Sequence, residues 1–266
     1  MNTVEKFIAL HHQEKPLILA NAWDAASAKI FEDLGAEAIA TTSAGVAWSL
    51  GYPDGHQLPA NYQVQLAKNI NRLIKIPLSV DFENGYSDDA AIVAENIKPL
   101  LDAGVAGINI EDGKDTPELL SRKIEAIKNV AEKNGVKLFI NARTDVYLAS
   151  LVPDAEKVAE TIKREKIYAA SGADGLFVPV IINATEIAEI AKNISLPLNV
   201  MAMPGLPNAN TLASLGVKRL SAGASIPQIA WQTAARIAKQ FLAEGDSGVF
   251  NEEAISGGKL QTLFSV

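Results

Sequence analysis

The stretch IKIPLSVD, residues 74–81, decides the fold because similar segments recur along the chain at a nearly constant interval. The related segments are EKPLILAN (14–21), NGVKLFINAR (134–143) and ISLPLNVM (194–201). Their equivalent leucines, at positions 17, 78, 138 and 198, lie 61, 60 and 60 residues apart. Short runs that are almost continuously apolar are typical of strands buried on both faces.

A second series of apolar runs lies between the first four. It comprises LGAEAIATT (34–42), AGVAGINIEDG (103–113), SGADGLFVPV (171–180) and LGVKRLSAG (215–223). In each, a glycine ends an amphipathic segment and a strand follows, as at a helix C-terminus capped by a left-handed glycine. Eight strands that alternate with helices predict a (β/α)8 TIM barrel, built as a single domain over residues 1–266. A doubly wound open sheet is less favoured, because no GxGxxG follows the first strand.

Composition narrows the class of protein. The net charge of −7 and the lack of a basic cluster argue against a nucleic-acid partner. The absence of cysteine excludes disulfides, thiolate metal sites and a cysteine nucleophile. With no signal peptide and no long apolar segment, we expect a soluble cytoplasmic protein without a membrane partner. The residues from about 245 onward break the strand–helix pattern and are expected to form a C-terminal extension, docked or exchanged between subunits.

The active site of such a barrel lies at the carboxyl ends of its strands. The residues expected there are Asn21, Trp23, Asp24, Thr42 to Gly45, Asp81, Glu83, Glu111, Asp112, Asn141, Arg143, Asp145, Pro179, Met203, Pro204 and Ser221 to Gly223.

Acidic residues dominate two of these strand ends. Asp81 and Glu83 are two residues apart, so both side chains would point to the same side of an extended strand end, and Glu111 ends the next strand. Three oxygen ligands without histidine or cysteine suit Mg²⁺. The alternative is a structural cluster in which Asp81 and Glu111 pair with Arg143. The following Asp88 and Asp89 are expected in the first turn of the next helix.

Other strand ends offer groups for binding or proton transfer. Arg143 can present a planar fork to a carboxylate or phosphonate, or can form a salt bridge with Asp145 or Glu111. The stretch TTSAG (41–45) has small residues that leave backbone amides accessible, as in an oxyanion cradle or an ordinary tight loop. Asp54 and His56, in the turn GYPDGH (51–56), are candidate acid/base groups.

Two further residues have a structural alternative. Asp24 is well placed as a helix N-cap, and Trp23 as the apolar residue that packs beside it. No lysine occupies a strand end, which disfavours a Schiff-base aldolase.

Six motifs, in this order and spacing, resemble the isocitrate lyase/phosphoenolpyruvate mutase superfamily. They are ANAWDAASA (20–28), TTSAG (41–45), SLGYPDG (49–55), VDFENGY (80–86), INIEDG (108–113) and INARTD (140–145), and the likeness runs from about residue 17 to about residue 223. The resemblance implies a (β/α)8 barrel that uses Mg²⁺ to bind an α-keto acid and stabilise its enolate. It also implies a homo-oligomer, a dimer or a tetramer built from dimers that exchange the last helix.

The resemblance also implies roles for individual residues. Asp81 would bind the metal directly, with Glu83 and Glu111 holding it through waters. Trp23, Ser43 and the amides of Ala44 and Gly45 would bind the substrate, and Arg143 would grip its other end. Asp54 matches the phosphoryl-accepting aspartate of the mutases, but the lyases have an aspartate there as well.

The chain departs from the family pattern at three places. The cysteine-bearing mobile loop of the lyases is missing from the segment IEDGKDTPELLSRKIEAI (110–127). The mutases have a gate with a lysine and an asparagine at the same place, and here only Lys114 is available. Pro179 stands where the family has a histidine or glutamate, and Glu83 replaces a more usual aspartate.

These observations predict a Mg²⁺-dependent carbon–carbon lyase or decarboxylase that acts on a small 2-oxo or 2-hydroxy dicarboxylate through an enolate. Asp54, His56 or a metal-bound water would transfer the proton. One alternative is a phosphorus–carbon bond mutase or hydrolase acting on phosphonopyruvate through Asp54. Another is a keto-acid-binding barrel without turnover.

Overall fold

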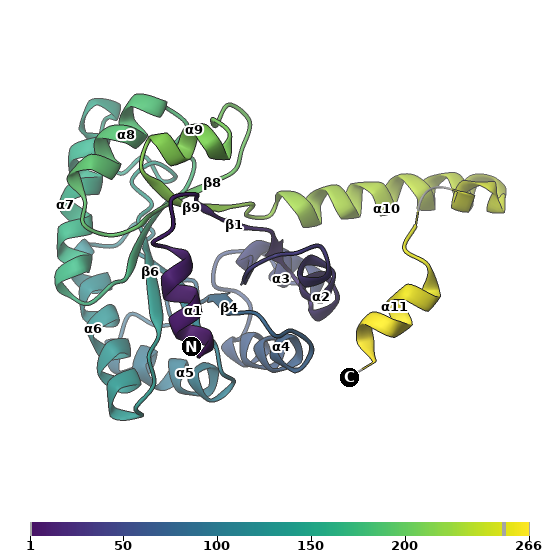
Figure 1. Cartoon of the computed structure of the whole chain (residues 1–266), viewed down its shortest axis with the longest axis horizontal. Helices are drawn as coiled ribbons and strands as arrows, with labels where there is room; N and C mark the ends of the chain where they lie inside the picture. The colour runs from purple at the N-terminus through teal and green to yellow at the C-terminus, as the bar shows by residue number, and fades with distance from the viewer. Residues whose placement is uncertain (1, 252–253, 266) are drawn as a thin grey trace.

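A computed structural model describes residues 2–251 and 254–265 and contains one parallel sheet rolled into a nearly closed barrel (Figure 1). The strands follow the order β1-β9-β8-β7-β6-β5-β4-β3-β2, and every pair is parallel. They are β1 (Leu17–Leu19), β2 (Asn21–Ala22), β3 (Ile39–Thr41), β4 (Leu78–Asp81), β5 (Gly107–Glu111), β6 (Phe139–Arg143), β7 (Gly175–Val178), β8 (Leu198–Met201) and β9 (Val217–Ser221).

The predicted (β/α)8 barrel is confirmed. β1 and β2 are two parts of one strand position interrupted at Ala20, since β1 pairs with β9 and β2 pairs with β3. The nine strands therefore occupy the eight predicted positions. The helices that cover them are α2 (Ala25–Asp33), α3 (Ser43–Ser49), α4 (Ala60–Leu73), α5 (Ala90–Asp102), α6 (Pro117–Lys133), η1 (Asp154–Glu156), α7 (Lys157–Ala170), α8 (Ala184–Asn193) and α9 (Ala209–Ser214).

Local sequence explains where the helices begin and end. Asp24 caps α2 by accepting a hydrogen bond from the amide of Ser27, and Asp89 caps α5 in the same way through Ala91. Asp24 agrees with the sequence-based expectation, whereas Asp89 is the N-cap and Asp88 precedes it, so neither lies in the first turn of α5 as expected. Gly104, with φ of 78°, ends α5 before β5, and Gly216, with φ of 93°, ends α9 before β9. Only glycine adopts this left-handed conformation without strain, so the repeated glycine determines the handover from helix to strand.

The amino ends of the strands are covered by helix α1 (Thr3–Leu10). Its Phe7 is fully buried and packs against Phe139 with a ring-centroid distance of 5.4 Å. A Cβ at Gly107 would lie 2.7 Å from the Phe7 ring, so the glycine makes room for it. This end of the barrel is therefore filled, and the opposite, carboxyl end carries the open mouth.

The C-terminal segment leaves the barrel. Helix α10 (Ser225–Glu244) projects away from it, and η2 (Ser247–Asn251) and α11 (Gly257–Phe264) follow (Figure 1). Lys259 on α11 pairs with Asp33 on α2 at 2.9 Å, so the chain returns to the outside of the barrel. None of the helices within the described ranges combines the length and apolar character needed to cross a membrane.

Candidate active site

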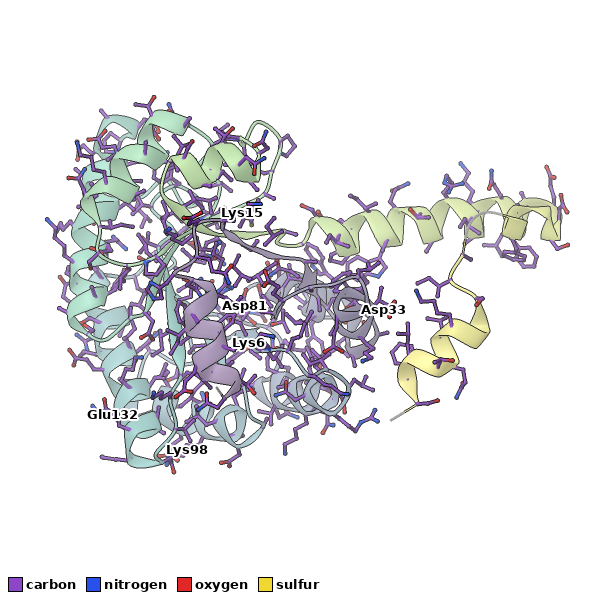
Figure 2. The ribbon with its side chains drawn as sticks, in the orientation of Figure 1. Lys6, Lys15, Asp33, Asp81, Lys98 and Glu132 are labelled. Carbon is purple, nitrogen blue, oxygen red and sulfur yellow. The ribbon has the colours of Figure 1, made fainter. Side chains whose placement is uncertain are left out.

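A cavity of about 320 Å³ opens at the carboxyl ends of the strands. Of the residues given a catalytic, binding or metal role, five line it, namely Ser43, Ala44, Asp54, Asp81 and Arg143. Six further residues expected at the strand ends also line it: Asn21, Thr42, Pro179, Met203, Ser221 and Gly223. Figure 2 shows Asp81 at the centre of the barrel, whereas Lys98 and Glu132 lie at the outer edge. The predicted residues Trp23, Gly45, His56, Glu83 and Glu111 do not line the cavity and lie in the shell around it.

Asp81 is a buried carboxylate at the end of β4, only 8% exposed. Its Oδ1 accepts a hydrogen bond from the Glu83 amide at 3.2 Å, and no ion pair to it forms within the described chain. Burial, together with the charges of Glu111 and Glu83, raises the pKa of Asp81 to about 7, although Arg143 opposes the shift. The charged form of Asp81 therefore has no ion-pair partner among the described residues, and Arg143 compensates it only in part.

Glu83 lies beyond the strand rather than on it. β4 ends at Asp81, and Glu83 has φ of 50°, so the expectation that both side chains share one side of an extended strand is wrong. Glu83 accepts hydrogen bonds from the His56 amide at 2.5 Å and from the Tyr86 hydroxyl at 3.0 Å. It thus ties the turn 51–56 to the barrel mouth.

Glu111 and Arg143 form a charged cluster beside Asp81. Arg143 Nη1 lies 2.7 Å from Glu111, while its Nε and Nη2 donate to Asp145 at 2.7 and 3.0 Å. His56 Nε2 lies 3.0 Å from the other Glu111 oxygen. Burial raises the pKa of Glu111, but the hydrogen bond with His56 and the charge of Arg143 outweigh it, so the net shift is downward. The structural pairing with Arg143 that the sequence left open is therefore present for Glu111.

The donor chemistry of this region fits a hard cation held directly by one carboxylate. Asp81 is the buried anion without a cationic partner, and Glu83 and Glu111 lie close enough to raise its pKa. In the part of the chain that the structure describes, no three acidic or histidine side chains converge as direct metal ligands. Mg²⁺ usually keeps several waters and needs only one or two protein carboxylates, so such a convergence is not required.

The loop after β3 turns directly into helix α3. Thr42 stands at the N-cap without a side-chain cap bond, so the first-turn amides, including those of Ala44 and Gly45, have no intrahelical partner. A Cβ at Gly45 would lie 2.6 Å from Thr42 Cγ2 and 3.1 Å from Trp23 Cβ. Gly45 thus shapes the loop by its small size, and Trp23 packs behind it.

The candidate acid/base residues separate. Asp54 is exposed at the rim of the cavity, whereas the His56 side chain is held by Glu111 outside the cavity lining. The hydrogen bond to Glu111 raises the pKa of His56. Burial lowers this pKa, but by less, so the net shift is upward. Of the two, only Asp54 lines the cavity.

The connection after β5 is short, as predicted. β5 ends at Glu111 and α6 begins at Pro117, which leaves residues 112–116. Asp112 is 2% exposed and bonds to Arg164 at 2.7 Å and to Tyr168 at 2.5 Å, so it supports the loop from below.

Several lining residues were not predicted from the sequence. Most of them are apolar, and the polar ones come from β5 and α10. They are Trp48, Asn109, Leu148, Phe177, Met201, Ala202, Ala224, Ser225 and Gln228. Asn109 had a sequence signal, since it is the one polar residue inside the apolar run GINI (107–110). Phe177 and Met201 lie on β7 and β8. The others come from helices and loops, whose orientation the strand pattern does not specify.

Comparisons with known proteins place this geometry in context. The family model for phosphoenolpyruvate phosphomutase matches residues 7–242. An uncharacterised protein of Mycobacterium tuberculosis H37Rv is 40% identical over 90% of both chains. An oxaloacetate decarboxylase of Pseudomonas fluorescens SBW25 is 32% identical, covering 77% of this chain and 72% of its own. A solved Burkholderia cenocepacia J2315 protein related to phosphonomutases is 36% identical, with a TM-score of 0.85 over 89% of this chain and 99% of its own.

Proposed function

This chain belongs to the phosphoenolpyruvate phosphomutase family, within the isocitrate lyase/phosphoenolpyruvate mutase superfamily, and from that premise we propose that it is a Mg²⁺-dependent carbon–carbon lyase or decarboxylase. Its substrate is a small 2-oxo or 2-hydroxy dicarboxylate that reacts through an enolate. One observation carries the proposal. A single cavity of about 320 Å³ holds Ser43, the unpaired Asp81 and Arg143 together.

The chain's own residues would bind the substrate at two ends. The hydroxyl of Ser43 and the free amides at the start of α3 would donate hydrogen bonds to the carboxylate and carbonyl oxygens at one end. Burial lowers the pKa of Arg143, but Glu111 and Asp145 raise it more, so Arg143 remains protonated. Its guanidinium would bind the other end of the substrate. Its guanidinium is already held in place by those two carboxylates, so little freedom is lost when it binds an anion.

Asp81 would hold the cation directly, and Glu83 and Glu111 would hold it through waters. When bound, Mg²⁺ supplies Lewis-acid stabilisation of the negative charge that develops on the substrate. The unpaired, buried state of Asp81 supports this role, because a cation would remove the cost of its uncompensated charge.

The short connection 112–116 and the missing cysteine favour reactions that need no lid-borne acid. Decarboxylation of a 2-oxo dicarboxylate meets this condition, because an exposed group such as Asp54, or solvent, can protonate the enolate. The 32% identical relative is named as an oxaloacetate decarboxylase.

Product release tests the proposal. With Mg²⁺ present, pyruvate or glyoxylate is expected from oxaloacetate or from an alkylmalate, and a chelator should stop its formation. If none of these substrates gives product at saturating Mg²⁺, the lyase assignment is wrong.

A second candidate is phosphorus–carbon chemistry on phosphonopyruvate, by a mutase or a hydrolase. It is favoured by Asp54, a carboxylate at the cavity rim and a potential phosphoryl acceptor. It predicts phosphoenolpyruvate or inorganic phosphate from phosphonopyruvate, with loss of that product in Asp54→Ala. Absence of both products from the wild-type protein rejects this candidate.

The oligomer we propose is a dimer, or a tetramer built from two such dimers, in which α10 packs on the partner barrel. A hollow of about 550 Å³ lies outside β1 and α2, and it is lined by Ile18 and Leu34, which are 59% and 76% exposed. Helix α10 leaves its own barrel and also exposes apolar side chains, including Ile229 at 67% and Leu242 at 82%. An exchanged α10 would cover both sets of apolar side chains.

A further inference from the structure

The floor of the cavity rests on a layer of asparagine side chains that the proposed chemistry does not use. Asn109 on β5, Asn141 on β6 and Asn199 on β8 are 5%, 1% and 1% exposed. Asn109 is in register with Asp81 on one side and with Asn141 on the other. Of the three, only Asn109 lines the cavity.

Backbone carbonyls fix the orientation of the first amide in this layer. Asn199 Nδ2 donates to the carbonyl oxygens of Val200 at 2.8 Å and Arg219 at 3.2 Å, and approaches the Ser221 hydroxyl at 3.2 Å. Carbonyl oxygens can only accept, so the amide nitrogen must face them. The oxygen of Asn199 is therefore turned toward Asn141.

This orientation passes from one amide to the next. Asn141 must meet the Asn199 oxygen with its nitrogen, and Nδ2 donates to it at 3.0 Å. The second hydrogen of the same NH₂ group points to Asn109 Oδ1 at 2.9 Å. Gly175 keeps this arrangement free of a clash, because a Cβ there would lie 2.8 Å from Asn141 Oδ1.

A buried arginine holds the same oxygen. Arg219 is fully buried, and its Nη2 donates to Asn109 Oδ1 at 3.3 Å, while its Nε and Nη1 have no hydrogen-bond partner among the described residues. A flipped Asn109 would turn its own NH₂ group toward the donors of Arg219 and Asn141, which are unable to accept a hydrogen bond. Two donors from within the barrel thus keep the oxygen of Asn109 inward.

The amide nitrogen of Asn109 is left on the cavity side, and no acceptor in residues 2–251 or 254–265 bonds to it. From this geometry we propose that Asn109 is a substrate-binding residue whose Nδ2 donates a hydrogen bond to an oxygen of the bound 2-oxo acid. β5 lies between β4 and β6, so this donor stands between Asp81 and Arg143. The Nδ2 group can bind an oxygen acceptor but not a protonated amine, because both would be donors. The site should therefore prefer 2-oxo acids to 2-amino acids. The inference rests on the proposed function.

Oxalate binding tests the role of Asn109, because oxalate mimics the enolate of a 2-oxo acid and offers only acceptor oxygens. Calorimetry with saturating Mg²⁺ would compare the wild-type protein with Asn109→Asp and Asn109→Ala. Asn109→Asp keeps an oxygen for Asn141 and Arg219 but lacks the donor, and Asn109→Ala lacks the donor without adding charge. Both are expected to bind oxalate roughly 10- to 100-fold more weakly, the effect of losing a hydrogen bond to a charged group.

The melting temperature separates a donor from a purely structural residue. Asn109→Asp should melt near the wild-type temperature, and the exposed control Asn69→Ala on α4 should bind oxalate normally. Wild-type affinity in both Asn109 variants overturns the inference and leaves the proposed function intact. Absence of oxalate binding by the wild-type protein contradicts the proposed function, and the inference with it.

Discussion

Asp81 is the residue on which the proposed chemistry depends most directly. Its neighbours Glu83 and Glu111 already have partners, whereas the Asp81 carboxylate has a single amide donor among the residues that the structure describes. Asp81→Asn removes the negative charge but keeps the shape of the side chain. We expect a loss of at least about 100-fold in Mg²⁺-dependent oxalate affinity and in turnover, since a direct ligand contributes several kcal/mol.

The same acidic stretch offers a control for Asp81. Asp88, whose side chain is 79% exposed, lies outside the mouth, so Asp88→Asn should keep full activity. Metal-free Asp81→Asn should also melt no lower than the wild-type protein, because it removes an uncompensated buried charge. Unchanged Mg²⁺-dependent binding in Asp81→Asn would be incompatible with the proposed metal site.

The sequence predicted which acids gather at the mouth and offered pairs of Arg143 with Glu111 or Asp145, but it did not choose between these pairs and a metal site. Asp81, Glu111 and Arg143 follow from the strand period, because residues at strand ends must meet at one edge of a barrel. The bond between His56 and Glu111 depends on the path of the turn 51–56, which no periodic pattern determines. Asn109 was missed because it lies within β5, whereas the expected site residues are those at the strand ends.

At the scale of single elements, helix α3 gives a test of the substrate cradle. A methyl group at position 45 would meet Thr42, Pro227 and Trp23 at 2.6, 3.1 and 3.1 Å. Gly45→Ala must therefore displace the start of α3, at a cost of about 1–3 kcal/mol for overpacking. Oxalate affinity and thermal stability should both fall, as measured by calorimetry and thermal melting.

Gly258 in α11 is the matched position, since a Cβ there meets nothing within 4 Å. Gly258→Ala should leave both quantities unchanged. If Gly45→Ala behaves like this control, the tight packing behind the cradle does not exist in solution.

Helix α1 makes the stability of the barrel floor dependent on pH. His11 is buried, stacks on Phe139 at 4.1 Å and bonds through Nδ1 to the Phe7 carbonyl at 2.8 Å. Burial and the nearby Arg219 lower the pKa of His11 from 6.5 to about 3. Below pH 6.5, His11 therefore becomes protonated in the unfolded chain but stays neutral in the folded protein. Neutral His11 contributes its full stability above the unfolded pKa, and this stability is lost as the pH falls toward 3.

Replacing this histidine should flatten the acid limb of the stability curve. Between pH 6 and pH 4, His11→Asn should lose less free energy of unfolding than the wild-type protein, by up to about 1.4 kcal/mol for each pH unit. Urea denaturation over this range measures the difference. The adjacent, exposed His12 is the control, and His12→Asn should follow the wild-type curve; identical slopes for all three proteins would show that His11 is not buried.

Most of the elements were predictable, because the helix–glycine–strand unit recurs through the barrel. The interruption of the first strand at Ala20 was not, since EKPLILAN reads as one continuous apolar run. The covering of the barrel floor by α1 was also missed. It depends on space that Gly107 leaves for Phe7, which is visible only when both elements are in place.

At the scale of the whole molecule, the projecting helix α10 and the hollow beside β1 both expose apolar side chains, which we expect a second copy of the chain to cover. Helix α10 has 20 residues, so it extends about 30 Å and can reach a second barrel. We expect light scattering after size exclusion to give a dimer or a tetramer. Ile18→Asp, in the lining of the hollow, should shift the protein toward the monomer, because a charge would have to be buried against α10.

Ile92 is the matched control for Ile18, since it is 50% exposed on the outer face of α5 and away from the hollow. Ile92→Asp should keep the wild-type mass. A monomeric wild-type protein at micromolar concentration, or an Ile18→Asp variant with unchanged mass, would contradict the exchange of α10.

The most direct test of the central claim is a crystal structure of the protein soaked with Mn²⁺, as a detectable substitute for Mg²⁺, and oxalate. We predict an anomalous peak beside the Asp81 carboxylate, with oxalate between this ion and Ser43 and with Glu83 and Glu111 reaching the ion through waters. Anomalous density elsewhere, or an Asp81 side chain turned away from both ion and oxalate, would contradict the account.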